Sequence, residues 1–142
     1  MKYILAALPA ELPEHNLDSE QYTVWFTGVG KVNAAMYATL ACAQTDCEAV
    51  INYGTAGTLT PELAGQLIQV GTVMQRDMDA RPLSALGITP MDMELYAIAK
   101  VCKHFSKTII AYKYVTDLAD KDAAEHWEEN HSKGAEAFLA MT

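Results

Sequence analysis

The stretch Glu48-Ala49-Val50-Ile51-Asn52-Tyr53-Gly54-Thr55-Ala56-Gly57-Thr58 decides the fold class of this 142-residue chain. Its first part, Glu48–Tyr53, is apolar and rich in β-forming residues, so it predicts a buried strand. Its second part, Gly54–Gly57, predicts a glycine-rich turn that lets the backbone approach a ligand closely. A tight turn without a ligand is an equally good interpretation of these residues alone. The turn is neither GxGxxG nor a Walker A sequence, so it does not predict a nucleotide-phosphate site.

Strand-like and helix-like segments alternate on both sides of this stretch. The other predicted strands are Tyr3–Leu8, Tyr22–Phe26, Gln66–Met74 and Thr108–Val115. Apolar residues at helical spacing predict helices at Lys31–Ala43, Met93–Phe105 and Asp122–Met141. Such alternation is typical of a mostly parallel sheet covered by helices on both faces. We therefore predict an α/β fold of three layers, αβα, with a central, mostly parallel twisted sheet.

Charge and hydropathy exclude several classes of function. The net charge is −8, and the only arginines are Arg76 and Arg81, so the basic stripe needed to bind nucleic acid is absent. No apolar run is long enough to span a membrane. Lys2 followed by Tyr3–Pro9 faintly imitates a signal peptide, but a first buried strand is the better interpretation. These observations predict a cytoplasmic protein that binds neither nucleic acid nor a membrane.

The cysteines and histidines do not predict a metal site or a cofactor. Cys42, Cys47 and Cys102 match no zinc or redox spacing, and their scatter is typical of buried thiols in a reducing cytosol. The four histidines share no metal-ligand spacing. Trp127, on the predicted last helix, is interpreted as a packing anchor. We expect neither a metal nor a cofactor.

Three acidic residues lie where a parallel sheet would place its chemistry. Glu11 follows the first predicted strand, Asp117 follows Thr108–Val115, and Glu94 lies in Met91-Asp92-Met93-Glu94-Leu95-Tyr96-Ala97 at the start of a helix. The carboxyl ends of parallel strands border the crevice where open α/β sheets bind ligands. Each acid also has an ordinary interpretation: a solvated loop residue, a helix cap, or a residue stabilised by the helix dipole. Their joint arrangement is more specific than any one of them.

Glu11 and four further segments occur in a characteristic order along the chain. The segments are Gly28-Val29-Gly30-Lys31-Val32-Asn33-Ala34-Ala35, Asn52-Tyr53-Gly54-Thr55-Ala56-Gly57, Met93-Glu94 and Thr116-Asp117. In this order they resemble the purine nucleoside phosphorylase/nucleosidase superfamily, and they are most similar to its 5′-methylthioadenosine/S-adenosylhomocysteine nucleosidase branch. The resemblance implies cleavage of the N-glycosidic bond of a purine nucleoside.

The resemblance also implies a role for each site residue. Asp117 would protonate or hydrogen-bond the purine near N7, and Glu11 would orient the attacking water. Glu94 would hold the ribose hydroxyls, and Met93 would pack on the sugar. The remaining substrate-binding residues would be Gly54, Thr55, Ala56 and Gly57. These roles suit the chemistry, because carboxylates stabilise an oxocarbenium-like transition state and an acid neutralises the departing base.

Two rival functions remain open at this point. A phosphorylase would need cationic or amide groups to clamp phosphate, and no arginine precedes Arg76, so we favour hydrolysis. An inactive nucleoside-binding relative is the other alternative. Relatives commonly form dimers or larger assemblies, so we also expect a homo-oligomer.

The junction between Pro90 and Met91 departs from the family pattern, because relatives carry further strands there. We predict a single domain over residues 1–142 with a segment missing between residues 90 and 91. A shortened relative is the alternative. Residues Arg76–Pro90 show no clear periodicity and are predicted to form a loop.

Overall fold

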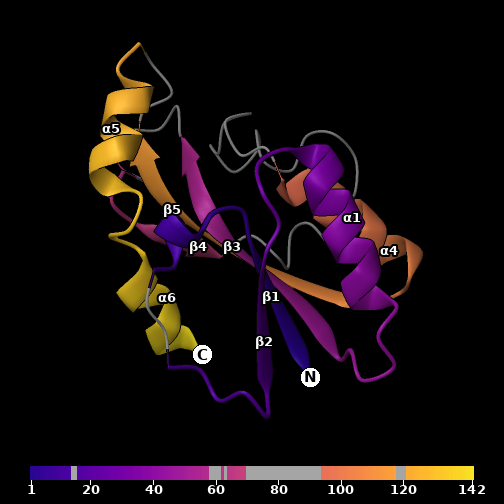
Figure 1. Ribbon diagram of the computed structural model, residues 1–142. Helices are drawn as coiled ribbons and strands as arrows, with labels where there is room; N and C mark the ends of the chain where they lie inside the picture. Colours follow the sequence, from indigo (N-terminus) through magenta and orange to yellow (C-terminus); the bar gives the residue numbers. More distant parts are fainter. Residues whose placement is uncertain (14–15, 58–61, 63, 70–93, 118–120) are drawn as a thin grey trace.

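The computed structural model describes residues 1–13, 16–57, 62, 64–69, 94–117 and 121–142, with the backbone alone at residue 117. Its described strands form one sheet in the order β2-β1-β3-β5-β4 (Figure 1). Strand β1 pairs in parallel with β2 and β3, and β3 pairs in parallel with β5. Strand β4 is antiparallel to β5. The strands are β1 (Lys2–Ala6), β2 (Tyr22–Phe26), β3 (Ala49–Gly57), β4 (Leu67–Gln69) and β5 (Thr108–Asp117).

Helices cover both faces of the sheet, which confirms the predicted mostly parallel α/β fold. On one face, α1 (Lys31–Cys42) packs against α4 (Leu95–His104). On the other face lie α5 (Ala123–Asn130) and α6 (Ala135–Met141) (Figure 1).

Alternating side chains of the strands build a separate core on each face of the sheet. Tyr3 and Leu5 pack with the helices α1 and α4, whereas Ile4 between them packs with α6. This is the two-residue period of a strand buried on both faces. On the α6 side, Phe138 is fully buried and stacks on Tyr53 with ring centroids 4.3 Å apart. Burying one such ring contributes roughly 1.5–3 kcal/mol.

The predicted turn at Gly54–Gly57 was wrong, because β3 continues through it. Gly54, Thr55 and Ala56 pair with Lys113, Tyr114 and Val115 of β5, and the register shifts before Gly57 pairs with Asp117. The parallel partner supplies backbone hydrogen bonds that the local sequence does not reveal.

The predicted single closing helix Asp122–Met141 was also wrong, because it is divided into α5 and α6. Gly134 lies in the connection, pressed against Tyr114 and Tyr53: a Cβ atom there would lie 2.6 Å from the Tyr53 hydroxyl oxygen. Only a residue without a side chain fits at this close approach. Gly134 therefore lets α6 approach the sheet closely enough to bury Phe138.

We expect Gly134→Ala to lower the free energy of unfolding by about 1–3 kcal/mol, because the added methyl group overpacks the contact with both tyrosines. Urea unfolding measures this loss. Ser132→Ala, an exposed position in the same connection, is the control and should change stability by less than about 0.5 kcal/mol. Equal stabilities of the two variants would contradict this account of Gly134.

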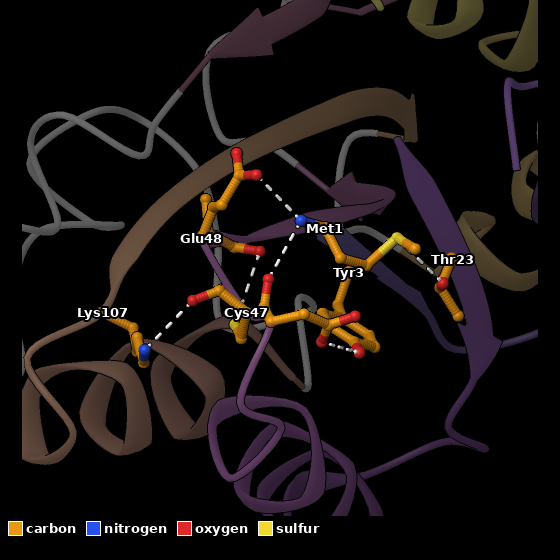
Figure 2. Close-up of polar contacts among 8 residues, drawn as sticks. Met1, Tyr3, Thr23, Cys47, Glu48 and Lys107 are labelled. Atoms are coloured by element: carbon orange, nitrogen blue, oxygen red, sulfur yellow. Dashed lines mark hydrogen bonds and ion pairs between the residues drawn. The ribbon is translucent and has the colours of Figure 1, made fainter. Parts of the chain in front are cut away.

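Polar contacts tie the amino-terminal ends of β1 and β3 together (Figure 2). The Met1 amine donates to the Asp46 carbonyl at 3.0 Å and to Oε1 of Glu48 at 2.9 Å. The Tyr3 hydroxyl donates to Oδ1 of Asp46 at 2.7 Å. Burial, reinforced by the Asp46 carboxylate, raises the pKa of Tyr3 to about 12, so its phenol stays neutral. These contacts lie at the end of the strands opposite to the predicted site.

Candidate functional site

A cavity of about 380 Å³ lies at the carboxyl ends of β1, β3 and β5. This is the edge at which open α/β sheets bind ligands. Its apolar wall comes from the segments after β1 and before α1, the end of β3, and α5. Its polar lining consists of Glu11, Thr55, Glu94, Thr116, Trp127 and Glu128.

The cavity brings together five of the predicted site residues, namely Glu11, Glu94, Thr55, Ala56 and Gly57. They come from three separate parts of the chain, so only the fold unites them. Trp127 of α5 also lines this cavity, so its role extends beyond the predicted packing anchor.

Glu11 is held as a buried hydrogen-bond acceptor. It ends the short 3-10 helix η1 (Pro9–Glu11) and is only 4% exposed, so the interpretation as a solvated loop acid is wrong. Its Oε1 accepts a hydrogen bond from the Leu8 backbone amide at 3.1 Å. Its Oε2 accepts from the backbone amide of Thr55 at 3.0 Å and from the Thr55 hydroxyl at 2.8 Å. Three donors directed at one carboxyl group fix its orientation at the cavity.

Glu94 is the N-cap residue of α4 and reaches across to the turn before α1. Its Oε2 accepts a hydrogen bond from the Gly30 backbone amide at 3.0 Å. Gly30 has a φ of +101°, a conformation that L side chains rarely adopt. The turn therefore presents its amide to Glu94, and this contact holds the carboxylate at the cavity.

Gly54 lies behind the cavity lining. A Cβ atom at this position would lie 3.2 Å from Nζ of Lys113 and 3.6 Å from Oε2 of Glu11. Lys113 itself is only 1% exposed. Gly54 therefore makes room for the buried Lys113 side chain and for the Glu11 carboxylate. Its predicted role in substrate binding stays a prediction.

Met93 and Asp117 are the two remaining predicted site residues. Met93 lies outside the described residues. Asp117 is the last residue of β5, where its backbone pairs with Gly57, but its side chain lies outside the described part. The neighbouring residues Gly57 and Thr116 both line the cavity. The roles of Met93 and Asp117 stay predictions.

Sequence reasoning missed Lys113 and the contact made by Trp127. Lys113 continues the alternation Ile109, Ala111 on β5, and a lysine in an otherwise apolar alternation is a signal that could have found it. The indole Nε1 of Trp127 donates to Oγ1 of Thr55 at 2.9 Å. No local pattern predicts a hydrogen bond between residues 72 positions apart.

Burial raises the pKa of Tyr53 beyond its ordinary value, and the charges of Glu11 and Tyr114 add to the effect. The phenol therefore stays neutral beneath the site. No three acidic, histidine or cysteine side chains in the described ranges are placed to hold a metal ion. None of the helices described is long and apolar enough to cross a membrane.

Comparison with known proteins points to one family. The model of the phosphorylase superfamily matches residues 14–84 and 71–141. A curated 5′-methylthioadenosine/S-adenosylhomocysteine nucleosidase from Marinomonas sp. (strain MWYL1) is 44% identical over 54 residues, which cover 37% of this chain and 23% of the relative. The chain thus spans about a quarter of the length of the curated relatives it matches.

Two solved structures share the fold over nearly the whole chain. A 5′-methylthioadenosine/S-adenosylhomocysteine nucleosidase from Helicobacter pylori, with butyl-thio-DADMe-Immucillin-A, aligns with a TM-score of 0.76 at 15% identity, covering 98% of this chain and 94% of that one. The futalosine hydrolase of the same organism, as a mutant, aligns with a TM-score of 0.75 at 14% identity, covering 98% and 95%. At these identities the likeness concerns the fold alone.

Proposed function

This chain belongs to the phosphorylase superfamily, and from that premise we propose that it hydrolyses the N-glycosidic bond of a purine nucleoside and releases the free base. The substrate would be of the methylthioadenosine or adenosylhomocysteine type, as the names of the matched relatives suggest. The observation that carries the proposal is that one cavity at the sheet edge is lined by both Glu11 and Glu94. Each carboxylate is held there by a hydrogen bond from a backbone amide.

The charge of the lining favours water over phosphate as the nucleophile. The cavity presents the carboxylates of Glu11, Glu94 and Glu128, and no lysine or arginine is among its described lining residues. An acidic lining repels a phosphate anion and stabilises the positive charge that develops on the ribose ring.

The proposed reaction assigns one task to each acid. Glu11 accepts a proton from a water molecule as the oxygen of that water attacks the anomeric carbon of the ribose. The C–N bond breaks, and Asp117 donates a proton to the departing purine. Glu94 accepts hydrogen bonds from the ribose hydroxyls, a task that suits a carboxylate because it has two acceptor oxygens. Met93 packs on the sugar.

The deciding experiment incubates the protein with methylthioadenosine, with and without inorganic phosphate, and separates the products by chromatography. Release of adenine and free methylthioribose without phosphate supports hydrolysis. Formation of methylthioribose 1-phosphate, dependent on phosphate, would replace hydrolysis with the phosphorylase alternative. A rise in melting temperature with adenine, but no base release, would indicate an inactive nucleoside-binding relative.

Glu94→Gln is expected to lower kcat/KM for a purine nucleoside by about 10- to 100-fold, because a hydrogen bond to a charged group contributes roughly 1.5–3 kcal/mol. The loss should be smaller for the 2′-deoxy analogue, which lacks one of the hydroxyls. Glu129→Gln, on the exposed surface of α5, is the matched control. Equal losses on the two substrates would remove the role of Glu94 in holding ribose.

We further propose a cytoplasmic location and a homo-oligomeric state. Cys42, Cys47 and Cys102 are all buried free thiols, as predicted, which suits a reducing compartment.

An exposed apolar stripe on and before α1 supports self-association. Light scattering of the purified protein measures the assembly state. The stripe consists of Val29, Val32, Met36 and Leu40, which are 47%, 85%, 51% and 47% exposed.

The predicted missing segment between Pro90 and Met91 falls in residues 70–93, outside the described part. It remains a proposal, motivated by the resemblance to the family of the segments on either side of residues 90 and 91. The length of the encoding gene decides between a lost segment and a naturally short relative.

A further inference from the structure

A chain of two hydrogen bonds runs from α5 to Glu11 in the lining of the cavity. The indole Nε1 of Trp127 donates to Oγ1 of Thr55 at 2.9 Å, and that hydroxyl donates to Oε2 of Glu11 at 2.8 Å. The three residues come from α5, β3 and η1, and all of them line the cavity.

The chemistry of the groups sets the direction of the hydroxyl proton. An indole N–H can only donate, so the threonine oxygen must act as the acceptor in the first contact. The hydroxyl carries one proton, and it is directed at Oε2 of Glu11, which also receives the Thr55 backbone amide at 3.0 Å. We propose that Trp127 is a positioning residue, which fixes the Thr55 hydroxyl so that the Glu11 carboxylate keeps the orientation required to align water. The inference rests on the proposed hydrolysis.

The arrangement leaves Glu11 little freedom to rotate. The Leu8 amide holds Oε1 at 3.1 Å, while both Thr55 donors hold Oε2. Without the indole donor, the threonine hydroxyl could rotate and donate to water instead. The Glu11 carboxylate would then lose one of the three hydrogen bonds that it accepts. The water that it orients would be less well aligned with the sugar.

Packing alone does not require an indole at this position. The Trp127 ring lies against His131, with ring centroids 4.8 Å apart, and a phenylalanine would supply a similar apolar surface. The N–H group is the part of tryptophan that phenylalanine lacks. Trp127→Phe therefore separates the hydrogen bond from the packing of the ring.

Steady-state kinetics of Trp127→Phe, Thr55→Val and the double variant test the inference. We expect Trp127→Phe to lower kcat about three- to tenfold with KM changed less than about twofold, the effect of one neutral hydrogen bond. Adding Trp127→Phe to Thr55→Val should cause little further loss, because the hydroxyl that the indole positions is already absent. Thr55→Ser keeps the hydroxyl and should restore the sensitivity to Trp127→Phe. An unchanged kcat in Trp127→Phe, or losses that multiply in the double variant, would overturn the proposal.

A second measurement does not depend on activity. The chain has two tryptophans, so a ¹⁵N–¹H correlation spectrum contains two indole signals, from Trp25 and Trp127. Thr55→Val should shift the Trp127 signal and speed its exchange with water, while Trp25, which packs against Tyr3 on the other side of the sheet, serves as the internal reference. An unmoved Trp127 signal would refute the contact. If the wild-type protein releases no base, the proposed function fails, and the spectrum still decides whether the contact exists.

Discussion

Glu11→Gln is expected to lower kcat for nucleoside hydrolysis by about 10²–10⁴-fold, the usual contribution of a positioned general base. An amide has nearly the same shape as a carboxyl group but cannot accept the proton of the attacking water. Binding of the substrate should change much less, because the change affects the water rather than the sugar or the base. The measurement is kcat and KM with methylthioadenosine at a temperature well below the unfolding transition.

The surroundings of Glu11 predict a loss of stability as well. One carboxyl oxygen faces the Leu8 amide and the other faces two donors of Thr55. In either orientation, the NH₂ group of glutamine would meet at least one N–H group, leaving a buried donor unpaired at a cost of roughly 1–3 kcal/mol. Thermal unfolding measures this loss, and Glu20→Gln on the exposed surface is the control. A variant with wild-type turnover would exclude Glu11 as the base.

Asp117→Asn is expected to lower release of adenine by about 10²–10⁴-fold, because the purine then departs without a proton from the protein. The fold should be retained, since the contact of Asp117 with Gly57 is a backbone pairing of β5 with β3. The measurement is single-turnover base release, with far-ultraviolet circular dichroism as the check on folding.

The choice of leaving group makes the test of Asp117 specific. A p-nitrophenyl riboside releases a phenolate that departs without protonation, so Asp117→Asn should slow this substrate much less than it slows a purine nucleoside. Glu11→Gln should slow both substrates, because both require the attacking water. Equal losses of Asp117→Asn on the two substrates would show that Asp117 is not the acid for the base.

Local patterns were sufficient to predict that strands alternate with helices and that the sheet is mostly parallel. The apolar run of β5 and the helical spacing of α1 were recognised because side chains two, three or four positions apart share a face. Residues such as Ile4 and Leu5 are buried on opposite faces of β1, which is why the strand reads as continuously apolar. The alternation of strands and helices then implied a mostly parallel sheet, and the sheet placed Glu11 and Glu94 at one edge.

Close contacts between distant segments were decided only by the tertiary structure. The extension of β3 through Gly57 depends on its partner β5, and the division of the last helix depends on the approach of Gly134 to Tyr53 and Tyr114.

The sequence by itself determined that strands alternate with helices and that Glu11, Glu94 and Asp117 lie at their ends, because these features depend on neighbours along the chain. It did not determine that Glu11 is buried, since the donors of Thr55 come from 44 residues away. Nor did it show that Trp127 reaches Thr55, 72 residues away. Those contacts exist because the fold brings the end of β3, η1 and α5 together, and their geometry depends on the whole fold.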